Sequence, residues 1–340
     1  MTAPLRLVAV LGPRWTSTSA LAAELTDLAS ARALPVGVSY PTEAEWFGRL
    51  RDGVTLHPEI VELSGAPRAR DEVAALRPRP TQGRQVVRDR LRRVADDARA
   101  ADAHTLLLVA PAAAWQAEPA ALRRELCAVA DTVDIVLPVR RADEALAAAL
   151  AQSVRLADTT NEVALTARAA LADDARAHEH RYAELLRRWV DPEGAVRVLV
   201  TPVTRGSAVE KLFATLNLEH SRADRTAEVA TAVTPPASRE ALEAIAKLAQ
   251  RRSRFGWVPG VRRRSDAQLI EARRSADDAA LAGVPAFAFG DSERRMLARR
   301  FRTDHDAVRA HVAWQWPSGA PEGPLRDAWL EWFADFPARP

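Results

Sequence analysis

The chain has 340 residues, 48% of them hydrophobic, which suits one large α/β domain or one such domain with a helical appendage. Its 48 basic and 45 acidic side chains nearly balance, and no nucleic-acid-binding motif appears, so we expect no nucleic-acid partner. No apolar run approaches the ~20 residues that span a membrane, no charged-then-apolar leader opens the chain, and the lone Cys127 excludes an internal disulfide framework. We therefore expect a cytoplasmic protein without a membrane span.

The first element is a strand over Leu7–Leu11, because a short continuous apolar run is typical of a buried parallel strand. Gly12-Pro13 ends it, a polar turn follows, and a helical apolar pattern starts at Ala20. A strand, a tight polar turn and a helix can together form an anion-binding site, because the N–H groups of the loop and the positive end of the helix converge on one point. A helix whose first turn is capped by an ordinary Ser or Thr side chain explains the same residues equally well.

The turn does not match a strict Walker loop. Against G-x-x-x-x-G-K-[ST], Gly12 and Ser19 fit, but Ser17 replaces the second glycine and Thr18 replaces the lysine. A phosphate or sulfate group is the ligand that this turn suits, without the lysine contact of an ATP-binding loop.

Four further strands and a series of helices follow in chain order. The remaining apolar runs predict strands over 34–38, 105–109, 133–139 and 196–201. Helical periodicity predicts helices over 85–101, 119–130 and 142–156, one or two helices within 161–190, and helices over 238–252, 265–281 and 292–312. Residues 41–83 show no clean period and suit a variable loop-and-helix segment.

This alternation predicts an α/β fold with a doubly wound, mainly parallel, five-stranded sheet. We expect the first strand in the interior of the sheet, an α/β domain over residues 1–220, and a helical C-terminal region over 221–340 packed on it. Ligands of such sheets bind at the carboxyl ends of the strands, where both Gly12–Ser19 and Arg140-Arg141 are found.

Three segments resemble the bacterial sulfotransferase family, whose fold is of P-loop type. Gly12–Leu21 (GPRWTSTSAL) follows the family's opening loop, G-M-H-R-S-G-T-S-A-L, in length and phase. Val133–Glu144 resembles its second signature, a buried strand that ends in Arg and leads into a helix, and Tyr182–Thr204 resembles its later helix and strand. The likeness spans roughly residues 5–220, with gaps.

The resemblance implies a donor, 3′-phosphoadenosine 5′-phosphosulfate (PAPS). It implies that the opening loop holds the 5′-phosphosulfate and that Arg140 holds the 3′-phosphate. The loop residues concerned are Gly12, Arg14, Thr16, Ser17, Thr18 and Ser19. A carboxylate partner, Asp143 or Glu144, is an equally good explanation for a charge at the end of a buried strand.

Three positions depart from the family pattern and favour a non-catalytic relative. Trp15 stands where the family has a basic residue, although Arg14 is adjacent. Ser17 stands where a glycine lets the backbone curl around the anion, and Ala148 stands at the 3′-phosphate serine position.

Sulfuryl transfer needs a base for the acceptor hydroxyl. The resemblance implies that residues 41–83 contact the acceptor, so His57 in that segment is our nominal base. A histidine in an exposed loop more often has no role. The basic stretch 251–264 faintly resembles the family's late Arg-Gly loop, so Arg254 and Trp257 are further candidates for cofactor binding. A solvated loop is the equal alternative there. We expect no metal, because His178 and His180 point to different faces of a helix.

The sequence thus favours a sulfotransferase-like protein that transfers a sulfuryl group from PAPS to the hydroxyl of a small molecule or a glycan. The alternative is a non-catalytic relative that acts as a binding or scaffold protein. A P-loop kinase or another NTPase is a weaker third option, because the Walker lysine is missing.

Overall fold

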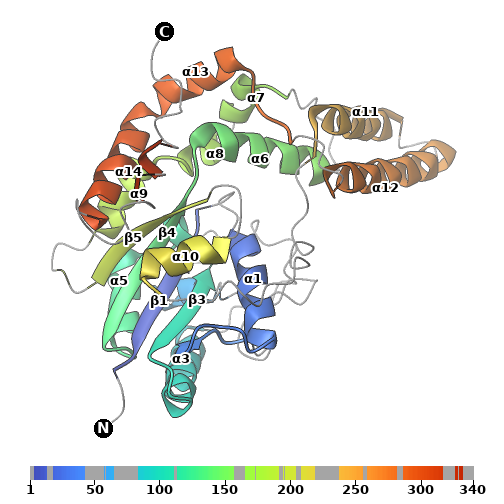
Figure 1. Cartoon of the computed structure of the whole chain (residues 1–340). Coiled ribbons are helices and arrows are strands. Elements are labelled where there is room, and N and C mark those ends of the chain that lie inside the picture. Colours follow the sequence, from blue (N-terminus) through green and yellow to red (C-terminus); the bar gives the residue numbers. More distant parts are fainter. Residues whose placement is uncertain are drawn as a thin grey trace. The chain divides into compact units, whose positions relative to one another are not determined.

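The computed structural model describes residues 4–13, 18–42, 57, 59–64, 83–110, 113–156, 165–172, 174–190, 194, 196–203, 208–218, 237–255, 259–281, 286–316, 326–327 and 329–331 (Figure 1). The chain forms two compact units that interleave along the sequence. Unit 1 comprises residues 1–140, 182–233 and 304–331, and unit 2 comprises 141–181, 234–303 and 332–340.

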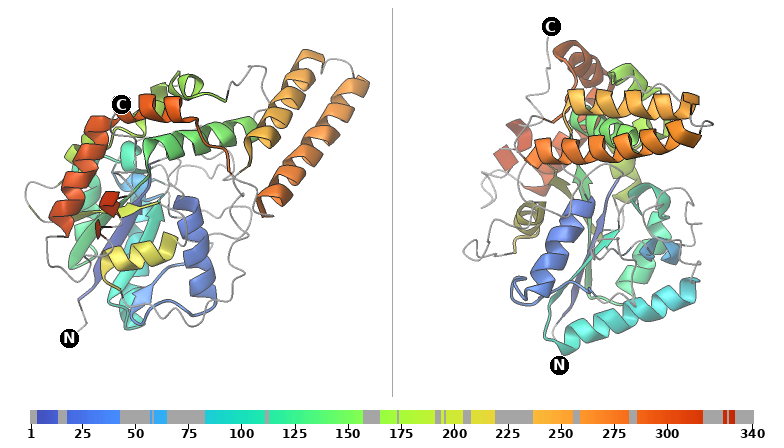
Figure 2. Two further views of the ribbon diagram at one scale, coloured as in Figure 1. Left: turned by 45° about the horizontal axis from the view of Figure 1, so that its top comes forward. Right: turned by 90° about the vertical axis from the view of Figure 1, so that its right-hand side faces the viewer.

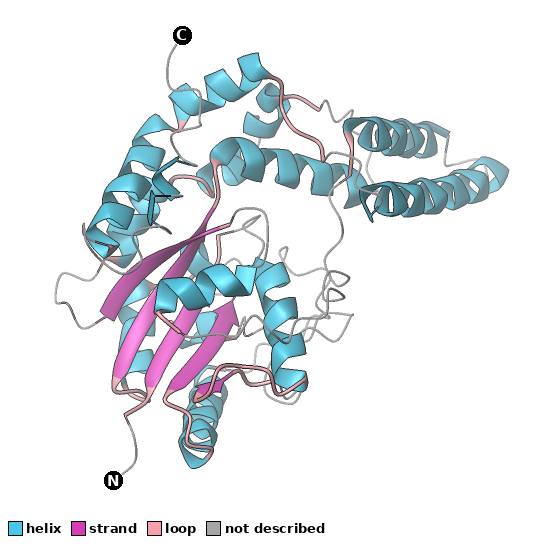
Figure 3. Ribbon diagram, in the orientation of Figure 1, coloured by secondary structure: helices cyan, strands magenta, loops and turns pink. Residues whose placement is uncertain are grey.

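Unit 1 is built on a five-stranded sheet in which all pairings are parallel (Figure 3). The strands lie in the order β2-β3-β1-β4-β5. Their bounds are β1 (Arg6–Leu11), β2 (Val38–Ser39), β3 (Thr105–Ala110), β4 (Thr132–Val139) and β5 (Val196–Pro202). The central position of β1, between β3 and β4, confirms the expectation that the first apolar run is an interior strand.

Helices cover both faces of this sheet, as Figure 2 shows with the sheet seen edge-on. On one face, α1 (Thr18–Ser30) and α10 (Ala208–Leu216) pack their apolar residues against Val8 and Val10 of β1. On the other face lie α3 (Arg84–Ala100) and α5 (Pro119–Cys127). Strands buried on both faces need continuous apolar sequences, and this is why β1, β3 and β4 were readable from the sequence.

The second strand is shorter than expected, because turn geometry occupies most of residues 34–38. Pro35 has no N–H to give to a ladder, and its carbonyl oxygen accepts a hydrogen bond from Val38 N–H at 3.0 Å. Gly37 has φ +73°, a left-handed conformation that suits a turn rather than a strand. Only Val38 and Ser39 therefore pair with β3.

Helix α14 (Arg302–Gln315) supplies side chains that bind the outer edge of β5. Val200 N–H donates to Gln315 Oε1 at 2.8 Å, and Gln315 Nε2 donates to the Val200 carbonyl oxygen at 3.3 Å. His311 Nε2 lies 3.0 Å from the Val198 carbonyl oxygen. The Gln315 amide thus satisfies both backbone groups of Val200, as a neighbouring strand would.

The remaining helices of unit 1 are short. They are α2 (Ile60–Leu63), α4 (Ala113–Gln116) and α9 (Tyr182–Trp189). Trp189 is fully buried, and its indole N–H donates to the Ala114 carbonyl oxygen at 2.8 Å, which joins α9 to α4. The tryptophan therefore has a packing role.

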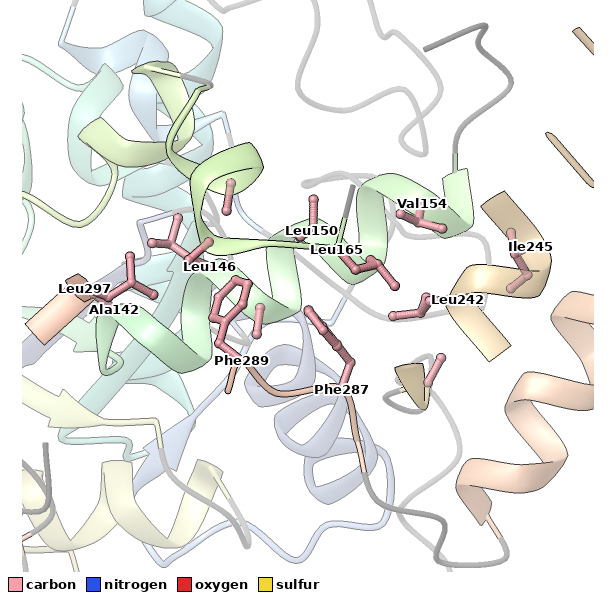
Figure 4. Packing of buried hydrophobic residues seen from close by; sticks show 14 of the residues in the cluster. Ala142, Leu146, Leu150, Val154, Leu165, Leu242, Ile245, Phe287, Phe289 and Leu297 are labelled. Carbon is pink, nitrogen blue, oxygen red and sulfur yellow. The ribbon is translucent and has the colours of Figure 1, made fainter. Parts of the chain in front are cut away.

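Unit 2 is helical in its described residues. Its helices are α6 (Ala142–Leu156), α7 (Ala167–Leu171), α8 (Asp174–His178), α11 (Arg239–Phe255), α12 (Pro259–Leu281) and α13 (Asp291–Arg300). Leu146 and Leu150 of α6 share one apolar cluster with Leu242 of α11 and with Phe287 and Phe289 (Figure 4).

The expected division at residue 220 differs from this arrangement. The buried apolar face of α6 is covered by residues 237–303, so α6, α7 and α8 join the later helices, whereas α14 returns to unit 1. The expected helix over 292–312 is two helices, because Phe301 has non-helical dihedral angles of −102° and 17°. Three short helices, α7, α8 and α9, replace the one or two expected within 161–190. No helix of the described residues has the length and apolar character to cross a bilayer.

Candidate functional site

The candidate site lies at the carboxyl ends of two adjacent parallel strands, β1 and β4. Val10 of β1 pairs with Val136 of β4, so the residues that follow both strands leave the sheet at the same edge. In the strand order, the connection from β1 leads towards β2 at one edge of the sheet, and the connection from β4 leads towards β5 at the opposite edge. Two neighbouring strands whose connections diverge define the point where open α/β sheets bind ligands.

Gly12 and Thr18 bring the two ends of the first loop together. Gly12 N–H donates to the Ala110 carbonyl oxygen at 3.2 Å, which extends the β1–β3 ladder by one residue. A Cβ atom on Gly12 would lie 1.9 Å from Thr18 Oγ1, so the buried Thr18 side chain occupies the space that the missing side chain leaves. Glycine is therefore required at position 12 by the close return of the chain into α1.

The electrostatics at the start of α1 differ from those at the start of α10 on the same face of the sheet. The first turn of α1 contains no acidic residue. At α10, by contrast, the carboxylate of Glu24 accepts hydrogen bonds from Ala208 N–H at 3.2 Å and from Val209 N–H at 3.3 Å. The positive end of α10 is thus neutralised by a side chain of the protein, whereas no acid lies within the first turn of α1 to oppose an external anion.

Glu24 also lies near Lys211 of α10, and it favours the charged form of that lysine. Burial has the larger effect and lowers the pKa of the Lys211 amine below its ordinary value. Sequence reasoning gave neither residue a role, because nothing in the pattern indicates that α1 and α10 lie beside each other.

The backbone of Arg140 is held at the end of β4 by a buried tyrosine. The Tyr182 hydroxyl accepts a hydrogen bond from Arg140 N–H at 3.1 Å and donates one to the Arg140 carbonyl oxygen at 2.9 Å. Tyr182 is fully buried, whereas Arg140 is half-buried. The hydroxyl therefore positions the residue that follows β4, a role that the sequence pattern did not indicate.

The carboxylate considered as a structural partner for Arg140 binds the next arginine instead. Arg141 Nε donates to Asp143 Oδ1 at 2.9 Å and Arg141 Nη2 donates to Oδ2 at 2.7 Å, while Arg294 Nε donates to Oδ2 at 3.0 Å. Burial alone would raise the pKa of Asp143, but the hydrogen bonds and charges of the two arginines outweigh it and lower the pKa. Glu144 lies 3.8 Å from Arg141 Nε.

His57, our nominal base, occupies a structural position rather than an exposed loop. It is fully buried, its backbone N–H donates to the Val109 carbonyl oxygen at 2.8 Å, and Val109 N–H donates to Nδ1 at 2.9 Å. Nε2 then carries the proton and donates to the Pro41 carbonyl oxygen at 3.1 Å. Burial lowers the pKa of His57 from 6.5 to about 4. Because its ring binds the backbone and stays neutral, we do not carry it forward as the base.

The remaining sequence candidates have less structural description. Arg14, Thr16 and Ser17 lie outside the described residues, and so does Trp257. Ser19 belongs to α1, but the position of its side chain is not described. Arg254 is exposed in the last turn of α11, where its guanidinium carbon lies 5.8 Å from the centre of the Phe255 ring.

The described part of the site thus consists of Gly12, Thr18 and Arg140 in unit 1. Within the described residues, no group of three or more His, Cys, Asp or Glu side chains has an arrangement that could hold a metal ion. These features define a protein with a parallel α/β sheet and a candidate anion site at its carboxyl edge. No model of a known protein family matches the sequence. No curated protein matches it either.

Proposed function

We propose that this protein binds PAPS at the β1–β4 edge and transfers its sulfuryl group to the hydroxyl of a small molecule or a glycan. The observation that carries the proposal is the close return of the chain from Gly12 to Thr18, at the end of the central strand and at the start of a helix without an acid in its first turn. The resemblance of this loop to the sulfotransferase loop supports the choice of an activated sulfate over other anions.

Each part of the donor would have its own partners. The loop N–H groups and the Thr18 and Ser19 hydroxyls would hold the 5′-phosphosulfate, and Arg140 would hold the 3′-phosphate. In the transfer, the acceptor oxygen forms a bond to sulfur while the bond from sulfur to the 5′-phosphate oxygen breaks. Positive charge near that leaving oxygen stabilises the transition state. The proton of the acceptor hydroxyl needs a base other than His57.

A second candidate function is a binding or scaffold protein that has the fold and lacks transfer activity. The burial of His57 favours this candidate, because it removes the base that the sequence suggested. Trp15, Ser17 and Ala148, which depart from the family pattern, favour it as well.

Calorimetry with 3′-phosphoadenosine 5′-phosphate, the donor product, tests the shared donor site, with ATP as the comparison ligand. Arg140→Ala should weaken binding of the donor product by about 10- to 100-fold, because a charge-assisted contact contributes roughly 1.5–3 kcal/mol. Arg197→Ala is the matched control. Arg197 is the second residue of β5 and bonds to Asp134, so it lies towards the amino end of the strands, away from the candidate site.

The outcomes separate the candidates. Binding together with release of the donor product from PAPS in the presence of an acceptor supports the transferase, whereas binding without turnover supports the non-catalytic relative. No binding of the donor product, or an equal loss of affinity in both variants, contradicts the donor site. Tighter binding of ATP than of the donor product would favour a kinase or another NTPase.

A further inference from the structure

The helices α11 and α12 of unit 2 form a helical hairpin with a strongly basic end. The two helices lie side by side in the views of Figures 1 and 2. Arg252 near the end of α11 forms an ion pair with Asp266 of α12, with 2.6 Å between Nε and Oδ1. At the other end, Arg155 of α6 pairs with Asp277 of α12, so the hairpin is anchored on α6 at the end opposite its turn.

The net positive charge of the chain comes from the residues around this turn. The 22 residues from Ala244 to Ser265 contain Lys247, six arginines and no acidic residue. The other 318 residues contain 41 basic and 45 acidic side chains, so without this stretch the chain would have a net charge of −4 instead of +3. This stretch, with seven basic and no acidic side chains, therefore accounts for the net positive charge of the chain.

Five of these arginines are exposed, and we call them the Arg tip: Arg251, Arg254, Arg262, Arg263 and Arg264. They come from the last turns of α11 and the first turns of α12. Beside them, Phe255 is 44% exposed, so an exposed aromatic residue accompanies these arginines. The residues that join the helices, Gly256, Trp257 and Val258, lie outside the described residues and are uncharged.

Helix stability does not explain this placement. Arginines near the end of α11 complement the helix dipole, but Arg262, Arg263 and Arg264 lie close to the positive end of α12, whose first turn contains no acid. Three adjacent like charges at that end disfavour the isolated hairpin. An external anionic surface would offset this repulsion, which indicates that the Arg tip has a binding role.

We propose that the Arg tip docks this protein on an anionic membrane surface. In sequence, the exposed Phe255 lies between the arginines of α11 and those of α12. This order matches the depth profile of a lipid interface, in which aromatic rings lie at the headgroup level and arginines bind the phosphates. A nucleic acid would instead favour a basic stripe along its backbone, and the net charge outside this turn is negative.

Vesicle sedimentation with the full chain tests the proposal. The parent protein should bind vesicles of phosphatidylcholine with about 30% phosphatidylserine, and should not bind pure phosphatidylcholine, since the attraction depends on anionic lipid. Replacing Arg262, Arg263 and Arg264 by Gln should weaken binding about 100-fold, at about fivefold for each arginine near the surface. None of these three arginines belongs to the candidate site at the β1–β4 edge, so binding of the donor product should be unchanged.

The matched control replaces Arg295, Arg299 and Arg300 by Gln. These arginines are exposed on α13, and their replacement removes the same amount of charge. This control variant should lose no more than a few-fold in vesicle binding. Phe255→Ser provides a second variant, without a change of charge, that should weaken binding several-fold. Circular dichroism melts confirm that each variant is folded.

Three results would overturn the proposal: no binding of the parent to anionic vesicles, equal losses in the two triple variants, or binding of a DNA or RNA duplex that is tighter than vesicle binding and is lost in the Arg262–Arg264 variant. The last result would identify a nucleic-acid partner. Because no residue of the β1–β4 edge is changed, failure here leaves the proposed donor site untouched, and failure of the donor site leaves the Arg tip proposal untouched.

Discussion

Replacing His57 by Asn should reduce the dependence of folding stability on pH. In the native protein the His57 ring is neutral, and burial lowers its pKa to about 4, whereas in the unfolded chain the pKa is near 6.5. Between these values the unfolded state binds the proton and the native state does not, so the contribution is fully present above pH 6.5 and is lost as the pH falls towards 4. Asn retains an acceptor for Val109 N–H.

The magnitude follows from the two pKa values. From pH 7 to pH 5 the parent should lose about 2 kcal/mol of unfolding free energy through His57, and about 3 kcal/mol once the pH reaches 4, at 1.36 kcal/mol for each pKa unit. Burial also lowers the pKa of His311, but that histidine is present in both proteins and its effect cancels in the difference between them.

Urea denaturation at pH 7, 6 and 5, followed by far-ultraviolet circular dichroism, measures this difference. The difference in unfolding free energy between the parent and His57→Asn should decrease as the pH falls. Only the parent has a histidine at position 57 that takes up a proton on unfolding. If the two proteins lose stability in parallel, the His57 ring is not buried and neutral, and its structural role in this site is refuted.

Three further substitutions test the geometry of the candidate site and its neighbour. Gly12→Ala should displace Thr18 and lower stability by roughly 1–3 kcal/mol, and calorimetry should show that binding of the donor product is lost. Tyr182→Phe should lower the unfolding free energy by roughly 1–3 kcal/mol, because it leaves the backbone N–H and carbonyl of Arg140 without the hydroxyl; an unchanged urea midpoint would contradict this contact. Asp143→Ala should destabilise the chain by roughly 3–5 kcal/mol, because two guanidinium groups lose a buried partner; thermal melts that match the parent would contradict the pairing.

The sheet could be predicted from the sequence because its main strands are apolar on both faces. β1, β3 and β4 each appear in the sequence as a continuous apolar run that is bounded by turn residues or polar segments. Such a run is typical of a buried strand. The assignment of helices to units could not be predicted. Periodicity shows that α6 and α14 each have an apolar face, but it does not show which distant segment covers that face.

The site was predictable where it depends on local chain geometry and unpredictable where it depends on distant contacts. Gly12 and Thr18 lie on a strand–loop–helix pattern, and their closeness follows from that pattern. The burial of His57, by contrast, depends on Pro41 and Val109, and no local signal reports either contact. Arg140 and Arg141 are adjacent in sequence, so only the structure shows that Asp143 binds Arg141.

The groups along the open edges of β5 and β3 affect how copies of this chain can associate. The Gln315 amide already bonds to Val200 of β5, and on the other side of the sheet His57 bonds through its backbone and ring to Val109 of β3, beyond the two-residue β2. Open strand edges are where sheets of separate molecules join. At Val200 and Val109, a second molecule could add a strand only after displacing Gln315 or His57. Contact between copies by sheet extension is therefore disfavoured at these positions, and a shortened chain that lacks α14 should gain a tendency to aggregate through β5.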